Sequence, residues 1–302
     1  MVLVKFVVSH KISGNKFTPI APRRDRSKRN AVMKSKGKGI KIVFTDIDGT
    51  LFSHATHRVP PSAIHAIEDM QAKGIKVFLC SGRNYYLIRK SGVLNAVHPD
   101  GMVTMNGSNA IIGGSIIYRY PIPSEIVDRM ILYAKRLRFG LTLIEEQEGH
   151  INMIDERVIS AHEKYGTRFP QPRTFPDHYD RVVYQMIAFC DDFDESLFMP
   201  HLPHCKSARW DEYAVDIMLK DSDKSKGVES VLEFFGLAPD QAMSFGDGEN
   251  DVEMLHYTGI GVAMGNGKKV AQKAADFVTA DIDEDGWAKA CLRYGLIDEI
   301  RP

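Results

Sequence analysis

Short apolar runs and helical segments alternate in two separate parts of this chain, and this alternation narrows the possible folds more than any other feature. The run KIVF at 41–44 predicts a short buried strand. The segment from Pro61 to Gly74 predicts a helix, because its apolar residues recur at helical spacing and a glycine ends it. IKVFLC, Ile75 to Cys80, predicts a second buried strand. A strand, a helix and a strand in this order form a βαβ unit with parallel strands.

The same alternation returns near the C-terminus. Residues 226–275 contain, in order, a helix, a strand that ends in a glycine-rich turn, a helix, a strand and a helix. A strand and a hairpin are also expected between residues 102 and 120. This pattern indicates an α/β fold built on a parallel sheet. The five C-terminal segments are 226–236, 242–248, 250–259, 259–265 and 268–275.

The middle of the chain, residues 121–207, has a different character. It is rich in proline and combines one long helical segment, 124–140, with strand-like pieces at 141–146, 150–154 and 183–189. An α+β domain inserted into the α/β domain accounts for this change of pattern. We therefore predict one discontinuous domain, 40–120 and 208–302, that is interrupted by a second domain.

Polar clusters follow three of the predicted strands. DID at 46–48, SGR at 81–83 and GDGEND at 246–251 each stand where an apolar run ends. In open α/β sheets, ligands bind beyond the carboxyl ends of the strands. We therefore expect the three clusters to share one site.

Asp46 and Asp48 are the first residues in the chain that suggest chemistry. Two carboxylates in one apolar site raise each other's pKa, and a divalent cation such as Mg²⁺ removes that cost. One carboxylate can then act as a nucleophile and the other as a general acid and base. A strand end with an Asp-Gly turn is the simpler alternative. A calcium loop is disfavoured, because Pro60 and Pro61 stand where a later acid is expected.

The other clusters add weaker signals of phosphate and metal binding. Ser81 and Gly82 offer a hydroxyl and backbone N–H groups near a helix start, which can hold phosphate oxygens. Lys226 precedes a glycine and a helix and could supply a positive charge, although Lys220 and Lys224 compete for that role. The acids of GDGEND form a second hard-metal signal. None of these loops has the GxGxxG spacing of a dinucleotide site.

The order of the motifs DIDGTL, SGR, DKSKG and GDGENDVEML resembles the haloacid dehalogenase superfamily of phosphohydrolases. The resemblance covers about residues 40–302 and is greatest to the Cof-type branch, subfamily IIB, which carries a large α/β cap. NGS at 106–108 and DEDGWAKA at 283–290 resemble that branch too. The chain is more similar to the sugar-phosphate phosphatases of the branch than to its phosphomannomutases. The resemblance implies a Rossmann-like parallel-sheet core with an inserted α+β cap over 121–207.

The resemblance also implies a role for each matching residue. Asp46 corresponds to the nucleophile that forms an aspartyl-phosphate, and it also binds the metal. Asp48 corresponds to the acid and base that protonates the leaving oxygen and activates water, with its backbone carbonyl on Mg²⁺. Ser81, Gly82 and Asn250 correspond to phosphate-binding residues.

Three further residues complete the implied site. Lys226 corresponds to the lysine that neutralises the phosphate and the nucleophile. Asp247 corresponds to a metal ligand, and Asp251 to an outer acid of the metal site. Mg²⁺ is the implied cofactor. Phosphoryl transfer mainly needs positioning and charge neutralisation, which a set of this kind provides.

The presence of Asp48 argues for phosphate esters independently of the resemblance. Displacement of a halide needs no proton donor, whereas an alkoxide leaving group does. We therefore predict a Mg²⁺-dependent phosphatase for small phosphate monoesters, with sugar phosphates as the main candidates. Two alternatives stay open: a phosphomutase that uses the same intermediate, and a sensor that binds sugar phosphates without turnover.

Several other residues attract attention but have simpler explanations. His54 and His57 lack a third metal ligand, so a place at the substrate rim is the better hypothesis. Trp210 is expected to pack rather than to bind a ligand. Glu145, Glu146 and Asn152 could meet a sugar hydroxyl, but solvated surface is the simpler expectation.

Residues 1–39 hold 11 Lys and Arg residues and a single acid, Asp25. Such a run predicts a disordered extension, or a start of translation at Met33, rather than a nucleic-acid site. The four cysteines show no pairing motif, which suggests a reduced, cytoplasmic protein. No apolar run reaches the length that spans a bilayer. We expect a monomer or weak homo-oligomer whose partner is a small-molecule phosphate ester.

Overall fold

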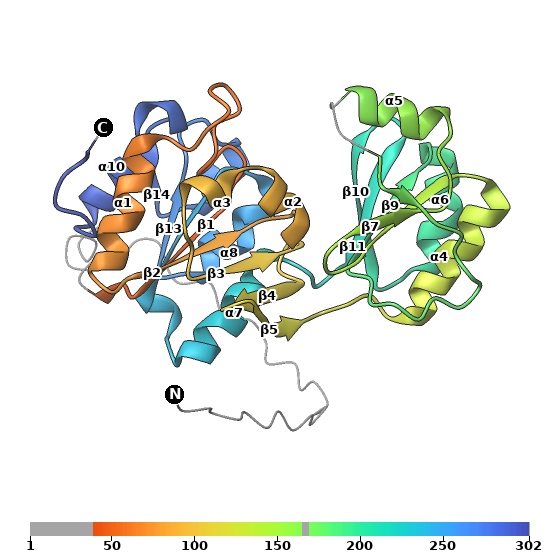
Figure 1. The fold of residues 1–302 in the computed structure, drawn as a ribbon, viewed down its shortest axis with the longest axis horizontal. Helices are drawn as coiled ribbons and strands as arrows, with labels where there is room; N and C mark the ends of the chain where they lie inside the picture. Colours follow the sequence, from red (N-terminus) through yellow and green to blue (C-terminus); the bar gives the residue numbers. More distant parts are fainter. Residues whose placement is uncertain (1–38, 165–168, 302) are drawn as a thin grey trace. The chain divides into compact units, whose positions relative to one another are not determined.

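The computed structural model describes residues 39–164 and 169–301, and its helices and strands are labelled in Figure 1. The strands form two sheets, one of eight strands and one of six. The prediction of an α/β fold with a parallel-sheet core is confirmed, and residues 1–38 lie outside the described residues. Within the described residues, no helix has the length and apolar character needed to cross a membrane.

The eight-stranded sheet is parallel except at one edge. Its order is β14-β13-β12-β1-β2-β3-β4-β5, and only β4 and β5 run antiparallel to their neighbours. The central strands are buried along their whole length, as expected for a parallel sheet covered on both faces. The strands are β1 Ile42–Thr45, β2 Lys76–Cys80, β3 Gly101–Thr104, β4 Asn109–Ile112, β5 Ser115–Arg119, β12 Ala242–Gly246, β13 Ile260–Ala263 and β14 Phe277–Val278.

Helices cover both faces of this sheet because successive strand residues point to opposite sides. Val43 packs in the apolar cluster that includes α1 and α10, which lie side by side in Figure 1. Ile42 and Phe44 pack in the cluster on the other face, with α7 and α8. The helices are α1 Pro61–Ala72, α2 Tyr85–Lys90, α3 Val93–Ala96, α7 Lys224–Phe235, α8 Val252–Tyr257, α9 Lys269–Ala274 and α10 Gly286–Arg293.

The six-stranded sheet and its helices, residues 124–219, form a second layered unit that we call the cap. The strand order is β10-β11-β9-β6-β7-β8. Helices α4 and α6 pack on one face through a large apolar cluster, and α5 packs on the other face through a small one. The elements are α4 Ser124–Leu137, β6 Gly140–Ile144, β7 Gly149–Ile151, α5 Glu156–Lys164, β8 Gln171–Pro172, β9 Gln185–Phe189, α6 Asp192–Phe198, β10 Cys205–Asp211 and β11 Ala214–Leu219.

The second domain boundary differs from the predicted one. β10 pairs with β11, and β11 pairs with β9, so both strands belong to the cap sheet. The boundary predicted at 207 therefore falls inside β10, and the chain leaves the cap after Leu219. The alternation in β10 is weak because the middle of this edge strand is largely exposed, and the sequence pattern therefore did not reveal it.

Candidate active site

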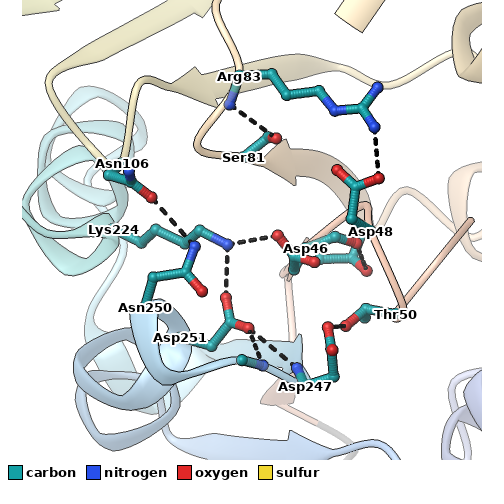
Figure 2. Close-up of polar contacts among 12 residues, drawn as sticks. Asp46, Asp48, Thr50, Ser81, Arg83, Asn106, Lys224, Asp247, Asn250 and Asp251 are labelled. Atoms are coloured by element: carbon teal, nitrogen blue, oxygen red, sulfur yellow. Dashed lines mark hydrogen bonds and ion pairs between the residues drawn. The ribbon is translucent and has the colours of Figure 1, made fainter. Parts of the chain in front are cut away.

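Three neighbouring strands bring the predicted polar clusters together. The sheet order places β1 between β12 and β2, with Thr45 level with Phe245 and Leu79. Asp46, Ser81 and Asp247 follow these three strands, so they emerge at the same edge of the sheet. Figure 2 shows the side chains that meet there.

A buried lysine joins two carboxylates at the centre of the site. The Lys224 Nζ donates to Asp46 Oδ1 at 2.5 Å and to Asp251 Oδ1 at 2.6 Å (Figure 2). Lys224 and Asp251 are fully buried, and Asp46 is 6% exposed. Buried charges are stable only when they are paired and hydrogen-bonded, so these three residues depend on one another.

The pKa values in this group shift in directions that follow from burial and charge. Burial raises the pKa of Asp46; Lys224 opposes this shift, and Asp251 and Asp247 add to it. Burial by itself would lower the pKa of Lys224, but the Asp251 and Asp46 carboxylates outweigh that effect and raise it. The lysine is therefore a permanent ammonium group beside Asp46.

The lysine at this position is not the one that we predicted. The Nζ of Lys226 lies 3.4 Å from Glu229 Oε2, on a half-exposed part of α7, and does not contact Asp46. Asp223 caps α7 by accepting a hydrogen bond from the Ser225 N–H, so Lys224 is the first helical residue. It shares the buried face of α7 with residues three and four positions later, whereas Lys226 faces outward.

A glycine allows the start of α7 to approach the loop after β3. Gly107 has φ +88°, and a Cβ at this residue would lie 1.8 Å from the backbone oxygen of Asp223. Next to this contact, Ser108 Oγ and Ser222 Oγ share a hydrogen bond of 2.6 Å. Ser222 Oγ also donates to the Asn106 carbonyl at 3.3 Å. These contacts fix the helix end that carries Lys224.

Asp247 and Asp251 hold different positions in the loop after β12. Asp251 Oδ2 accepts hydrogen bonds from the N–H groups of Asp247 and Gly248 at 3.0 and 2.8 Å, so both of its oxygens are engaged. Asp247 Oδ1 accepts a hydrogen bond from Thr50 Oγ1 at 2.7 Å. A Cβ at Gly49 would lie 2.7 Å from Asp247 Oδ2, so only glycine fits beside that oxygen.

The acidic group has the composition of a hard-metal site. One carboxylate oxygen from each of Asp46, Asp247 and Asp251 lies within 4.8 Å of the others. Among the described residues, the second oxygens of Asp46 and Asp247 have no hydrogen-bond donor. Carboxylate oxygens are the ligands that Mg²⁺ prefers, so the residues present fit this ion.

Asp48 lies on the other side of the site with two basic groups. Its Oδ1 accepts a hydrogen bond from Arg83 Nη2 at 2.5 Å, and His54 Nε2 lies 3.4 Å away. Ser81 Oγ accepts a hydrogen bond from the Arg83 N–H at 3.1 Å, so the loop after β2 is folded back on itself. The carboxylate of Asp48 is about one-third exposed and can reach a ligand.

Asn250 extends the site toward the loop after β3. Its Nδ2 donates to Asn106 Oδ1 at 3.1 Å, and the Asn106 side chain also lies against Gly82. The structure thus brings together Asp46, Asp48, Ser81, Asp247, Asn250 and Asp251, places Gly82 against Asn106 at the same site, and leaves out Lys226. It adds Thr50, Arg83, Asn106 and Lys224, which the predicted set did not contain.

Two cap residues that could have met a sugar hydroxyl have internal partners instead. Glu145 is buried, accepts a hydrogen bond from Tyr179 at 2.5 Å and forms an ion pair with Arg181 at 2.8 Å. The Asn152 side chain bonds the Leu141 N–H and the Phe139 carbonyl. Both side chains therefore stabilise the cap.

Comparison with known proteins gives consistent matches over most of the chain. The sequence profile of the haloacid dehalogenase-like hydrolases matches residues 43–291. A protein of Bacillus subtilis (strain 168) with the name "Putative phosphatase YkrA" is 29% identical over 85% of this chain and 98% of its own length.

Two solved structures share the fold. The HAD subclass IIB sugar phosphatase BT4131 is 36% identical, covers 85% of this chain and 100% of its own, and gives a TM-score of 0.72. The phosphatase BT1666 from Bacteroides thetaiotaomicron is 29% identical, covers 85% of this chain and 96% of its own, and gives a TM-score of 0.77.

Proposed function

This chain belongs to the haloacid dehalogenase-like hydrolase family, and on that premise we propose that it is a Mg²⁺-dependent phosphatase for small phosphate monoesters, chiefly sugar phosphates. The general class, a phosphatase, agrees with its named relatives. The observation that carries the mechanism is the buried Lys224 ammonium, which holds an oxygen of Asp46 at the end of β1. A carboxylate fixed next to a permanent positive charge suits attack on a phosphate.

In the first step, an oxygen of Asp46 attacks phosphorus while the bond from phosphorus to the ester oxygen breaks. Asp48 gives its proton to the departing oxygen, so the alcohol leaves as a neutral molecule. In the second step, Asp48 takes a proton from water, and the oxygen of that water attacks phosphorus. Asp46 is released as a carboxylate together with inorganic phosphate.

The other residues of the site hold the phosphoryl group. Ser81 and the N–H groups around Gly82 face it from the loop after β2, and Asn250 faces it from the loop after β12. Lys224 takes the role that we predicted for Lys226, because it is the lysine that contacts Asp46.

Mg²⁺ would be held by Asp46, Asp247 and the backbone carbonyl of Asp48. The ion would neutralise and orient the phosphoryl oxygens when bound. Asp251 keeps its predicted place as an outer acid of the metal site, since one of its oxygens lies within 4.8 Å of oxygens of Asp46 and Asp247 while it bonds Lys224 and two backbone N–H groups. We assign it the task of positioning Asp247 and Lys224.

The preference for sugar phosphates is supported by the subclass IIB sugar phosphatase that shares 36% of its residues with this chain. We expect the enzyme to act on small molecules in the cytoplasm, as a monomer or weak homo-oligomer. The four cysteines are free and buried, as expected for a reduced compartment.

The test is phosphate release from a panel of phosphomonoesters, with Mg²⁺ and with excess chelator. The panel contains hexose and pentose phosphates, nucleotides, flavin mononucleotide, pyridoxal phosphate and p-nitrophenyl phosphate. We expect release from the sugar phosphates that stops with chelator and returns when Mg²⁺ is added back. An isomerised sugar phosphate in place of free phosphate would indicate a mutase. Absence of any product from folded, Mg²⁺-supplied protein would overturn the proposal.

A further inference from the structure

One face of the cap sheet has a polar centre that its internal packing does not explain. Val215, Ile217 and Leu219 of β11 point into the cluster with α4 and α6, so Asp216 and Met218 point to the other face. On that second face, α5 covers one end by packing against Phe189 and Ala214.

The rest of this face adjoins the α5 cluster, against which Ile187 packs. We call it the polar face. Its residues alternate along each strand with those that point toward α4 and α6, and they are level with one another across neighbouring strands. Asp216 is level with Ile187 of β9 and Ala208 of β10, and Met218 is level with Lys206. Trp210, beside them, is 38% exposed. The polar face consists of Gln185, Ile187, Lys206, Ala208, Trp210, Asp216 and Met218.

Asp216 stands at the middle of the polar face, and its two hydrogen-bond donors are uncharged side chains. Its Oδ1 accepts a hydrogen bond from Trp210 Nε1 at 2.9 Å, and the Gln185 side chain donates a second bond to the carboxylate. Burial raises the pKa of Asp216 to about 6, and these two bonds lower it only in part. Among the described residues, no lysine, arginine or histidine forms an ion pair with this carboxylate.

Asp216 is half-buried, and its lack of a cation contrasts with the buried carboxylates of the active site and of Glu145. Asp46 and Asp251 share Lys224, and Glu145 bonds Arg181. A carboxylate that loses water without gaining a cation destabilises the fold. Residues that break a rule of stability in this way are commonly kept for binding.

The chemistry of the polar face selects one class of ligand group. An ionised carboxylate accepts about four hydrogen bonds, and Trp210 and Gln185 supply two, so two acceptor positions remain. These positions favour O–H donors and repel anions. The ring of Trp210 adds a flat apolar surface beside them, which suits the C–H face of a ring-shaped ligand. A neutral group with several hydroxyls satisfies both features.

The polar face is connected to the phosphate end of the site by a short series of contacts. Lys206 Nζ donates to the Ser222 carbonyl at 2.7 Å, and Ser222 Oγ bonds the Asn106 carbonyl. Asn106 Oδ1 in turn accepts a hydrogen bond from Asn250. The polar face therefore begins at the same linker that leads from β11 to Lys224.

We propose that the polar face binds the hydroxylated, non-phosphate part of the substrate, with Asp216 accepting hydrogen bonds from its hydroxyl groups and Trp210 packing against its ring. This inference rests on the proposed phosphatase function and adds a specificity-determining residue to it. It also gives the reason for a preference for polyhydroxylated esters over plain ones.

The first test compares two esters on one variant. We expect Asp216→Asn to lower kcat/KM for a hexose phosphate by about 10- to 100-fold, the effect of losing hydrogen bonds to a charged group. Hydrolysis of p-nitrophenyl phosphate, which has no sugar hydroxyls, should stay within about twofold of wild type. The matched control is Asp177→Asn, which changes an exposed cap aspartate bonded to Lys135 and should alter neither ester.

Two outcomes would overturn the inference while the phosphatase proposal stands. Equal losses of kcat/KM for both esters would mean that Asp216 stabilises the fold or assists the reaction itself. Unchanged hydrolysis of the hexose phosphate would remove it from substrate recognition.

A binding measurement separates this inference from the catalytic one. Trp210 is one of two tryptophans, and the other, Trp287, is buried at 1% exposure. In Asp46→Asn protein, a hexose phosphate should change the emission of Trp210 saturably, and inorganic phosphate should not. The response should vanish with Trp210→Phe and weaken with Asp216→Asn. A saturable response without turnover of any ester by wild type would sink the proposed function but support this inference. No response in folded protein would overturn the inference.

Discussion

One site in the core and one in the cap withdraw carboxylates from water, but the two sites treat the charge in opposite ways. At the edge of the eight-stranded sheet, Asp46 and Asp251 share the ammonium group of Lys224. On the polar face of the cap, the donors to Asp216 within residues 39–164 and 169–301 are the neutral side chains of Trp210 and Gln185. The core carboxylates are held by an internal cation, whereas the cap carboxylate keeps acceptor positions for another molecule.

This difference separates two tasks that an enzyme of this kind has to perform. Compensated charges fix one geometry, which suits a reaction whose atoms must always meet in the same way. An uncompensated acceptor lowers stability but remains available for a ligand. On our proposals, the core carries the chemistry and the cap carries the selection. The following predictions test that division, starting with the largest expected effect.

Asp46→Asn should abolish turnover of every ester, because the amide is not a nucleophile. We expect kcat to fall on the order of 10⁴-fold or more, as is usual when a nucleophile is removed. Circular dichroism and thermal unfolding should show an intact fold, since the side chain keeps its size. Near-wild-type turnover of the sugar phosphates would disprove the mechanism.

Lys224→Gln and Lys226→Gln form a matched pair of substitutions two residues apart. The first leaves Asp46 and Asp251 buried without a cation, so it should cost about 3 kcal/mol of unfolding free energy and about 10³-fold in kcat/KM. The second removes only a half-exposed contact with Glu229 and should have little effect on either. Denaturant titration and steady-state kinetics measure the two quantities. Equal effects of the two substitutions would contradict the assignment of Lys224.

Asp216→Asn should stabilise the protein at neutral pH while it weakens sugar-phosphate hydrolysis. The pKa of Asp216 is about 6 in the folded protein, above its ordinary value of 3.8. Between pH 3.8 and pH 6, the folded protein therefore keeps a proton on Asp216 that the unfolded chain has lost. Unfolding free energy therefore falls as pH rises from about 4 to about 6.

The variant should thus gain about 1 to 3 kcal/mol above pH 6 and nothing below pH 4. Thermal unfolding from pH 4 to pH 8 measures this gain, with Asp177→Asn as the control. A variant that is less stable than wild type at pH 8 would mean that Asp216 stabilises the cap instead of serving a ligand.

Thr142→Val should give the smallest effect, a gain of about 1 kcal/mol in unfolding free energy. The Oγ1 of Thr142 in β6 is buried and has no hydrogen-bond partner in the part of the chain that the structure describes, so valine removes a polar atom that gains nothing from its position. Thr104→Val in β3 is the equivalent change in the core and should give a similar gain. Denaturant titration compares both variants with wild type. A loss at either residue would indicate that its hydroxyl has a partner.

Most of the core could be predicted from sequence because its signals are local. Asp46 and Asp48 stand directly after an apolar run, and sheet order alone brings Ser81 and Asp247 beside them. Lys224 was missed because motif spacing alone favoured Lys226. The helical pattern held the missing signal: Lys224 shares a stripe with Gly227, Val228 and Val231, all of which are buried.

The cap was harder to predict because the residues of its proposed site do not lie in one segment of the sequence. Asp216, Trp210 and Gln185 come from three strands, and only the pairing of β9, β10 and β11 brings them together. That pairing is specified by contacts between distant residues, which no short pattern encodes. Glu145 was expected on the solvated surface, but it is buried and pairs with Arg181 and Tyr179.

Ser222 stands two residues before Lys224, and this position has a consequence for the exchange of inserted domains in such proteins. Ser222 and Asp223 are held by the loop of Gly107 and Ser108, which belongs to the eight-stranded sheet and not to the cap. The chain segment after Leu219 is therefore fixed by the core. A different inserted domain could replace residues 124–219, provided that its last residue connected to the segment that contains Ser222. Exchange of the inserted domain would then leave Lys224 in position beside Asp46.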